Sequence, residues 1–245
     1  MKEHIYDKVT HLGGSQAMSW DAADLGRYEQ SITLKIPGYD HMHHMMEQLL
    51  AASITNNNDI HILVTGAGGG KELALLGANH LDWQLTGMDT SSRMLKLAQQ
   101  KAEEAGITGR TTLLQGTIEQ LPATVLYDGA TCMLMLHFIQ GMEAKKTFLQ
   151  HLAQRLKPGA PLIIAAVDAD LASPAYPVMM KAWREHMLQA GILAEEWERF
   201  TASLGQQSDP VSGELMVELL GECGFCGMTR YFGAFWVEAY YAIRD

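Results

Sequence analysis

The sequence predicts a single α/β domain, because apolar runs typical of strands alternate with helical segments through its middle. The run at 162–167 is continuously apolar, as expected for a parallel strand that is buried on both faces. A helix stop at Lys157-Pro158-Gly159 precedes that run directly. With 245 residues, of which 47% are apolar, the chain is long enough to bury one substantial core.

Five strands and the helices between them are predicted from these runs and from the loop signals that separate them. The loop signal Asn56-Asn57-Asn58-Asp59 marks where this core begins. The strands are expected at 60–65, 83–88, 111–115, 128–135 and 161–167. The helices between them are expected near 70–79, 91–105 and 143–156.

Helical patterns flank this core on both sides. Apolar residues recur at helical spacing before it, over 20–34 and 40–54, and again after it, between 174 and 222. Two β-like runs close the chain near 227–232 and 235–243. The late helical stretch is too short to form a hydrophobic core of its own. We therefore expect an insertion that covers a substrate and not a second domain.

A glycine cluster at 66–70 directly follows the first apolar run, and Asp89 ends the second. Glycine lets the backbone approach a ligand closely, and a helix that begins there offers free amides. A carboxylate at the end of the next strand can accept hydrogen bonds from both hydroxyls of a ribose. The pattern therefore predicts a nucleoside site.

The residues after the glycines separate three kinds of nucleoside site. A phosphate-binding P-loop needs Ser or Thr after its Gly-Lys, and here Glu72 follows Lys71. A dinucleotide fingerprint needs its third glycine at the position of Lys71, which disfavours a nicotinamide dehydrogenase. The interpretation that remains is a loop that holds a cofactor without phosphates, of the S-adenosylmethionine kind.

Several segments resemble the motifs of class I S-adenosylmethionine-dependent methyltransferases, over roughly residues 38–245. The matching segments are Val64-Thr65-Gly66-Ala67-Gly68-Gly69-Gly70, Met88-Asp89-Thr90-Ser91, Gln115-Gly116-Thr117-Ile118, Tyr127-Asp128-Gly129-Ala130 and Leu156-Lys157-Pro158-Gly159. The resemblance implies a Rossmann-like, doubly wound seven-stranded sheet with an antiparallel C-terminal hairpin. It also implies that the cofactor binds at the strand C-termini. From the layout of the helices, we expect the N-terminal and inserted helices to form a lid.

The resemblance also implies a role for each matching residue. Asp89 is expected at the ribose, and the loop backbone at the methionine portion of the cofactor. The expected cofactor-binding residues are Tyr39, Gly66, Ala67, Gly68, Asp89, Thr90, Met94, Gly116, Thr117, Ile118, Met133 and Leu134. Among these, the 116–118 segment is expected at the adenine, Met133 and Leu134 near the sulfonium, and Tyr39 over the cofactor.

The sequence departs from the family at Val64, where an acidic residue usually helps to hold the methionine ammonium. Without that acid, we expect backbone carbonyls to hold the ammonium alone, or the affinity to be weaker. Within a single domain at 1–245, we expect four parts. They are an N-terminal helical cap at 1–58, a cofactor-binding core at 59–173, a helical lid at 174–222 and a closing hairpin at 223–245.

The acceptor side is predicted from fewer residues. His137 follows the fourth strand and is the candidate catalytic base, with a structural histidine as the alternative. Arg199 is the candidate substrate-binding residue, and an ion pair with Glu195 or Glu196 is the alternative. The apolar acceptor wall is expected to contain Trp183, Trp197, Phe200, Phe235 and Trp236.

These features predict a methyltransferase that acts on a small molecule, and two other functions stay open. A looser likeness to carboxy-S-adenosylmethionine synthase rests on Ile36-Pro37-Gly38-Tyr39, on the spacing to Asp89 and on an arginine in the late helices. That function would place Arg199 at a carboxylated cofactor. The other alternative is a non-catalytic protein that binds S-adenosylmethionine.

Composition narrows the partners and the compartment. With 18 basic and 28 acidic residues the net charge is −10, which disfavours nucleic acid as a partner. The charged start at 1–8 does not resemble a signal peptide, no apolar run is long enough for a membrane span, and three cysteines favour the cytoplasm. Neither His43 with Glu47 nor Cys223 with Cys226 has a convincing metal-site spacing, so no metal is expected. A homodimer stays open.

Overall fold

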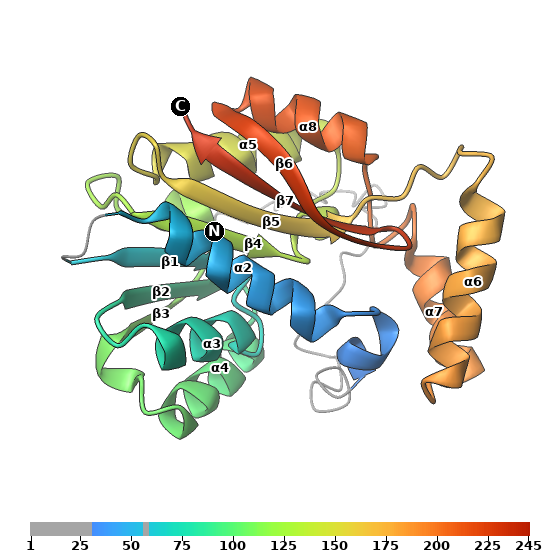
Figure 1. The fold of residues 1–245 in the computed structure, drawn as a ribbon, viewed down its shortest axis with the longest axis horizontal. Helices are drawn as coiled ribbons and strands as arrows, with labels where there is room; N and C mark the ends of the chain where they lie inside the picture. The colour runs from blue at the N-terminus through green and yellow to red at the C-terminus, as the bar shows by residue number, and fades with distance from the viewer. Residues whose placement is uncertain (1–30, 56–58) are drawn as a thin grey trace, which may run out of the picture.

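The computed structural model describes residues 31–55 and 59–245, and its centre is a seven-stranded sheet (Figure 1). The strand order is β3-β2-β1-β4-β5-β7-β6. The strands are β1 (His61–Thr65), β2 (Gln84–Asp89), β3 (Thr111–Gln115), β4 (Gly129–Met133), β5 (Pro161–Val167), β6 (Phe225–Ala234) and β7 (Val237–Arg244). The seven-stranded α/β fold that the resemblance implied is therefore confirmed.

The first five strands are parallel, and the C-terminal hairpin is antiparallel to them. β1 pairs with β2 on one side and with β4 on the other, so the chain winds outward from β1 in both directions. β7 pairs antiparallel with β5, from Pro161 opposite Ile243 to Val167 opposite Val237. All five parallel strands therefore end at one edge of the sheet, where ligands of doubly wound folds bind.

Helices cover both faces of the sheet and bury two apolar clusters (Figure 1). One face carries α2 (Tyr39–Ser53), α3 (Lys71–Asn79) and α4 (Ser92–Glu104), and the other carries α5 (Met142–Gln154) and α8 (Gly213–Glu222). β5 is fully buried along its length, as its continuous apolar run predicts. Two further helices, α6 (Tyr176–Gln189) and α7 (Ala194–Ser203), lie beyond the tips of the parallel strands.

Local sequence signals explain where the helices near the site begin. The Ser91 hydroxyl accepts a hydrogen bond from the Met94 amide and caps α4. Gly70 precedes α3 with a φ of 82°, and a Cβ there would lie 2.8 Å from the Ala98 Cα of α4. Glycine at this position therefore allows α3 and α4 to pack closely beside the loop.

The structure differs from the sequence expectations in three places. The fourth strand ends at Met133 and not at 135, because Leu134 adopts a left-handed φ of 56°. Helix α8, which falls in the expected lid segment at 174–222, packs against β6 and α5 on the sheet. The lid role of the N-terminal helices and of that segment stays a prediction. Of the expected helix at 20–34, residues 31–35 are helical and the rest, with the charged start at 1–8, lie outside the described residues. Among the residues that the structure describes, no helix has the length and apolar character that a membrane span requires.

Candidate active site

Two adjoining cavities lie at the carboxyl edge of the sheet. The first has a volume of about 350 Å³ and is lined by the glycine loop after β1, the end of β2 and the end of β4. The second has a volume of about 490 Å³ and is lined mainly by residues of α6 and α7 and of the loop after α7. Ile32, Leu134 and Phe138 line both cavities, so the two share a wall.

The glycine loop brings main chain to the surface of the first cavity. Gly66 has a φ of 65°, and a Cβ on it would lie 2.6 Å from the Met135 Cγ. The Ala67 amide donates to the Met88 carbonyl at 2.8 Å, which ties the loop to the end of β2. A larger residue at position 66 would therefore fill the cavity or displace Met135.

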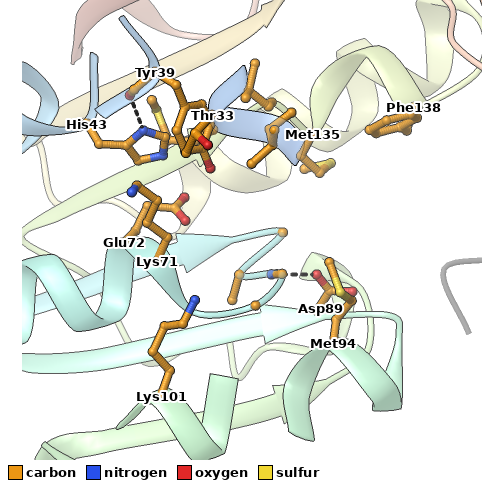
Figure 2. Close-up of a pocket in the computed structure, with 17 residues that line it drawn as sticks. Thr33, Tyr39, His43, Lys71, Glu72, Asp89, Met94, Lys101, Met135 and Phe138 are labelled. Atoms are coloured by element: carbon orange, nitrogen blue, oxygen red, sulfur yellow. Dashed lines mark hydrogen bonds between the residues drawn. The ribbon is translucent and has the colours of Figure 1, made fainter. Parts of the chain in front are cut away.

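Asp89 is fixed at the end of β2 by two backbone amides. The Gly68 amide donates to its Oδ2 at 2.9 Å (Figure 2), and the Ser91 amide donates to its Oδ1, also at 2.9 Å. Each carboxylate oxygen has two lone pairs, so both oxygens keep acceptor capacity for a ligand. The side chain lines the cavity in one orientation, as bidentate binding of a diol requires.

The structure brings most of the predicted cofactor-binding residues together around the first cavity. Those that line it are Tyr39, Gly66, Ala67, Gly68, Asp89, Met94, Met133 and Leu134. Thr90, Gly116, Thr117 and Ile118 follow the ends of β2 and β3 but do not line this cavity. Ile118 is 2% exposed and packs in the core, so it is not open to the cavity. The adenine roles of these residues stay predictions.

Leu134 forms part of the wall between the cavities with an uncommon backbone. Its φ of 56° is rare for a residue other than glycine and costs of order 1–3 kcal/mol. Its amide donates to the Ala165 carbonyl at 2.7 Å, which holds this conformation against β5. Such strain at the end of a parallel strand is typical of functional sites.

Tyr39 covers one side of the first cavity with charged and aromatic neighbours (Figure 2). The Lys71 ammonium lies 5.0 Å from the Tyr39 ring centroid and pairs with Asp40 at 2.6 Å. The His43 Nδ1 donates to the Tyr39 carbonyl at 2.9 Å, and burial lowers the pKa of His43 to about 4. His43 is therefore neutral at pH 7.

Glu72 lines the first cavity and was not expected there. It lies in the first turn of α3, is 6% exposed, and its Oε1 is buried without a hydrogen-bond partner among the described residues. Burial raises the pKa of its carboxyl to about 8. The sequence shows an acidic residue just after the glycine loop, but it does not show that this residue points inward.

Aromatic side chains from three segments cluster beside the second cavity, as predicted. The Trp183 ring centroid lies 4.9 Å from Phe200, 5.8 Å from Phe235 and 6.5 Å from Trp197. Only Trp183 and Phe200 line the cavity itself. Trp236, which was also expected in this wall, lines a separate cavity beside Glu238. The predicted wall therefore includes residues that only support the lining.

His137 lies in the second cavity as a buried, neutral ring. The Val167 amide donates to its Nδ1 at 3.2 Å, so a neutral ring carries its proton on Nε2. Burial first, and then the charge of Lys145, lower the pKa of His137 to about 3. Two contacts fix the chain segment that carries His137. The Asp209 amide donates to the His137 carbonyl at 2.7 Å, and the Asp209 side chain forms an ion pair with Lys145 at 2.6 Å.

Arg199 lines the second cavity and not the first. Glu196, one of its two alternative partners, pairs with Lys35 at 3.5 Å. Ser203, Ser208 and Gln207 line the same cavity, so its apolar wall carries polar groups on one side. Across the described part of the chain, no three His, Cys, Asp or Glu side chains are grouped as metal ligands.

The strand order and the donor-side cavity define a class I methyltransferase fold. The cavity fits an adenosyl cofactor without phosphates, because glycine at 66 keeps a Cβ out of its wall, Asp89 lines it, and Glu72 places a carboxyl group with a buried, unpartnered oxygen beside it. Residues 62–159, from β1 to the turn before β5, match the family described as a methyltransferase domain.

Two curated relatives and one solved structure agree with this match. The ubiquinone biosynthesis O-methyltransferase of Rickettsia canadensis is 30% identical over 126 residues, which is 50% of this chain and 50% of that protein. The O-methyltransferase resE of Aspergillus sclerotiorum is 29% identical over 74% of this chain and 60% of its own length. The N-methyltransferase NodS of Bradyrhizobium japonicum, solved with S-adenosyl-L-homocysteine, has a TM-score of 0.58 at 14% identity, covering 90% of this chain and 98% of NodS.

Residues 62–159 therefore contain a methyltransferase domain, and the two O-methyltransferases agree with this match over part of their length. This chain spans about half the length of the first of the curated relatives that it matches. The similarity to NodS concerns the fold alone at this level of identity.

Proposed function

We propose that this protein transfers the methyl group of S-adenosylmethionine to a hydroxyl oxygen of a small aromatic molecule. The observation that carries the proposal is the pair of adjoining cavities, which share a wall at Ile32, Leu134 and Phe138. One cavity has the features of a nucleoside site and the other those of an aromatic acceptor site. This arrangement places a donor and an acceptor side by side, as methyl transfer requires.

On the donor side, the cofactor supplies an electrophilic methyl group on its sulfonium. Asp89 accepts hydrogen bonds from the ribose hydroxyls, and the two amides that fix it keep its carboxylate oriented. The loop at Gly66–Gly68 presents backbone to the methionine portion. Met133 and Leu134 exclude water from the space between the two cavities.

On the acceptor side, Trp183 and Phe200 hold an aromatic ring, and Arg199 pairs with an acidic group on the acceptor. The curated relatives named above are O-methyltransferases by name, which supports a hydroxyl acceptor. The acceptor oxygen forms the new carbon–oxygen bond, the electrons of the broken carbon–sulfur bond stay on sulfur, and the hydroxyl proton leaves to solvent.

In this proposal, His137 donates a hydrogen bond from its Nε2–H to the acceptor oxygen. Its Nδ1 accepts the Val167 amide, and its low pKa of about 3 makes it a weak base at pH 7. Phenols suit such a site, because they ionise more readily than aliphatic alcohols and need less help from a base. This role replaces the expected general base with a hydrogen-bond donor that orients the acceptor.

The position of Arg199 favours this function over a carboxy-S-adenosylmethionine synthase. In such an enzyme Arg199 would face the cofactor, whereas here it lines the acceptor cavity. Free cysteines at 132, 223 and 226 suit a reducing cytoplasm. A homodimer, the absence of nucleic-acid partners and the lid role of α6 and α7 remain predictions.

The test combines ligand identification with turnover. Mass spectrometry of the denatured protein identifies any adenosyl compound that remains bound after purification, and we expect S-adenosylmethionine or S-adenosylhomocysteine. Incubation with S-adenosylmethionine and a panel of phenols and catechols should yield S-adenosylhomocysteine and a product 14 mass units heavier. A carboxylated cofactor would favour the synthase, and cofactor binding without turnover of any acceptor would favour the non-catalytic alternative.

A further inference from the structure

Glu72 places a buried carboxyl group in the first cavity, and the proposed function gives it no role. Its side chain lines the cavity from the first turn of α3, and its Oε1 has no hydrogen-bond partner among the described residues. A buried carboxyl oxygen without a hydrogen-bond partner is destabilising. A ligand group that completes its hydrogen bonds would explain why a carboxyl group is found here.

The position of Glu72 relative to Asp89 limits which part of the cofactor it can meet. These two are the carboxyl side chains that line the first cavity in the described chain, and Figure 2 shows them on opposite sides of the glycine loop. Asp89 is held by the Gly68 and Ser91 amides at the ribose end. Glu72 therefore lies at the other end of a bound adenosyl ligand, where its amino-acid portion is expected.

The residue that normally binds the amino-acid portion is missing from β1. Val64 stands at the position of the family's acidic residue, is 0% exposed, and packs in the same apolar cluster as Leu73 of α3. No polar group at position 64 can reach the ligand. Besides Asp89, the carboxyl group that lines this cavity among the described residues is that of Glu72, in the first turn of α3.

We propose that the Glu72 carboxylate binds the α-ammonium group of the amino-acid end of the cofactor, in place of the acid missing at position 64. The inference rests on the proposed function, because it assumes an adenosyl cofactor in the first cavity. It replaces the expectation that backbone carbonyls hold this ammonium alone. The loop and α3 would thus supply what β1 does not.

The surroundings of Glu72 favour its protonated carboxyl, so binding of an ammonium group requires the release of that proton. A hydrogen bond from its own backbone, Lys71 and Lys101 favour the charged carboxylate, whereas Asp89 opposes it. Burial raises the pKa of Tyr231 in β6 and of Cys132 in β4, and the charge of Glu72 adds to both shifts. Burial outweighs the two lysines and raises the pKa of the carboxyl to about 8, so it is mostly protonated at pH 7. An ammonium in contact with it favours the carboxylate, and the carboxyl proton then leaves to the buffer.

The experiment compares two ligands that differ only at the amino-acid end. S-adenosylhomocysteine carries the α-ammonium without the sulfonium, whereas 5′-methylthioadenosine has neither and keeps the adenosine. Titration calorimetry at pH 7, in buffers with different ionisation enthalpies, measures both the affinity and the proton release. For the wild-type protein we expect release of about one proton with S-adenosylhomocysteine and none with 5′-methylthioadenosine.

The variant Glu72→Gln keeps the shape of the side chain but cannot become charged. We expect it to bind S-adenosylhomocysteine about 10- to 100-fold more weakly without proton release, and to bind 5′-methylthioadenosine as the wild type does. Unchanged binding of 5′-methylthioadenosine also shows that the variant is folded. The matched control is Glu104→Gln, at the exposed end of α4, which should change neither affinity.

The melting temperature of the ligand-free protein gives a second readout, in which Glu72→Gln should stabilise the fold although it weakens binding. Because the pKa of Glu72 is raised above the value in an unfolded chain, ionisation of its carboxyl destabilises the fold as pH rises towards 8. We expect Glu72→Gln to remove this loss, so that its melting temperature at pH 8 lies above that of the wild type. A carboxyl group with a purely structural role would give a lower melting temperature.

The outcomes separate this inference from the function on which it rests. If the wild type binds neither ligand, the proposed cofactor site and this inference both fail. If the wild type binds S-adenosylhomocysteine and Glu72→Gln binds it equally well, the inference alone is overturned. Loss of binding for S-adenosylmethionine but not for S-adenosylhomocysteine would instead assign Glu72 to the sulfonium, which also contradicts it.

Discussion

The two cavities of this protein differ in what builds them. The first is lined by the glycine loop and the ends of β2 and β4, together with side chains from residues 32–43, α3 and α4. Its two predicted anchors, Gly66 and Asp89, lie within one β-α-β segment. The second is made of side chains that converge from residues 32–36, from the end of β4 and from α6 and α7. The comparison teaches that the predicted anchors of the first cavity are set by backbone geometry, whereas the second cavity is set by tertiary packing.

The strongest test of the donor side is Asp89→Ala. It removes both acceptors for the ribose and leaves the Gly68 and Ser91 amides without their partners, so we expect the affinity for S-adenosylhomocysteine to fall by at least about 100-fold. Titration calorimetry measures the loss. Asp82→Ala, in the exposed turn before β2, should bind as the wild type does. An unchanged dissociation constant in the Asp89 variant would show that the carboxylate does not hold the ribose.

Gly66→Ala tests whether the main chain itself shapes the first cavity. A Cβ at position 66 would lie 2.6 Å from Met135, and the φ of 65° adds strain, so we expect a loss of about 2–4 kcal/mol in the free energy of unfolding. Gly106 has a φ of 67° but nothing within 4 Å of a Cβ, so Gly106→Ala should lose only about 1 kcal/mol. Urea denaturation compares the two. Equal losses would mean that close packing at Gly66 is unimportant.

Each cavity holds one buried histidine, which offers a pH comparison. The pKa values of His43 and His137 are lowered to about 4 and about 3, so between those values and about 6.5 the unfolded chain binds more protons. The free energy of unfolding therefore loses about 2 kcal/mol for each histidine between pH 7 and pH 5. Ionising carboxyls such as Glu72 act in the opposite direction, so variants must be compared and not total stabilities.

The variant His43→Gln should remove the part of this loss in the free energy of unfolding that comes from the histidine of the first cavity. Chemical denaturation at pH 5 and pH 7 should show a smaller difference for it than for the wild type. His41→Gln, at an exposed position of the same helix, is the control and should keep the wild-type difference. A His43 variant with the wild-type pH dependence would contradict the neutral, buried state of that ring.

The smallest expected effect is on the acceptor side, at Arg199. Its guanidinium is exposed to solvent, so Arg199→Ala should raise the KM for an acidic phenol by only about fivefold and leave cofactor affinity unchanged. A phenol without an acidic group should show no change. Arg184→Ala, on the surface of α6, serves as the control. A weaker affinity for the cofactor instead would point to the carboxylated-cofactor alternative.

The sequence predicted many of the residues that line the first cavity, because its signals there are local. Asp89 and the glycine loop are recognised from residue types at fixed spacing, and the alternation of strands and helices places them at one edge of the sheet. The C-terminal hairpin was implied by the resemblance, and its pairing with β5 bears this out. The left-handed backbone at Leu134 was not predicted, because leucine carries no signal for that conformation.

The lining of the second cavity and the position of Glu72 depend on contacts that residue types do not reveal. The aromatic cluster was expected, but which rings line the cavity is decided by how α6 and α7 pack, and Trp236 lines another one. The His137 tautomer depends on the Val167 amide, which is a contact between residues 30 positions apart. Glu72 was missed because glutamate is normally exposed, and only the packing of α3 shows that it points inward.

The backbone at Leu134 has a consequence for how this protein could diversify. Because its amide donates a hydrogen bond to the Ala165 carbonyl, this part of the wall between the cavities is held by β5 and not by α6 or α7. New acceptors could then be accommodated by exchanging side chains on α6 and α7 while the position of the transferable carbon stays constant. Chemistry and selectivity would thus evolve on separate parts of the chain.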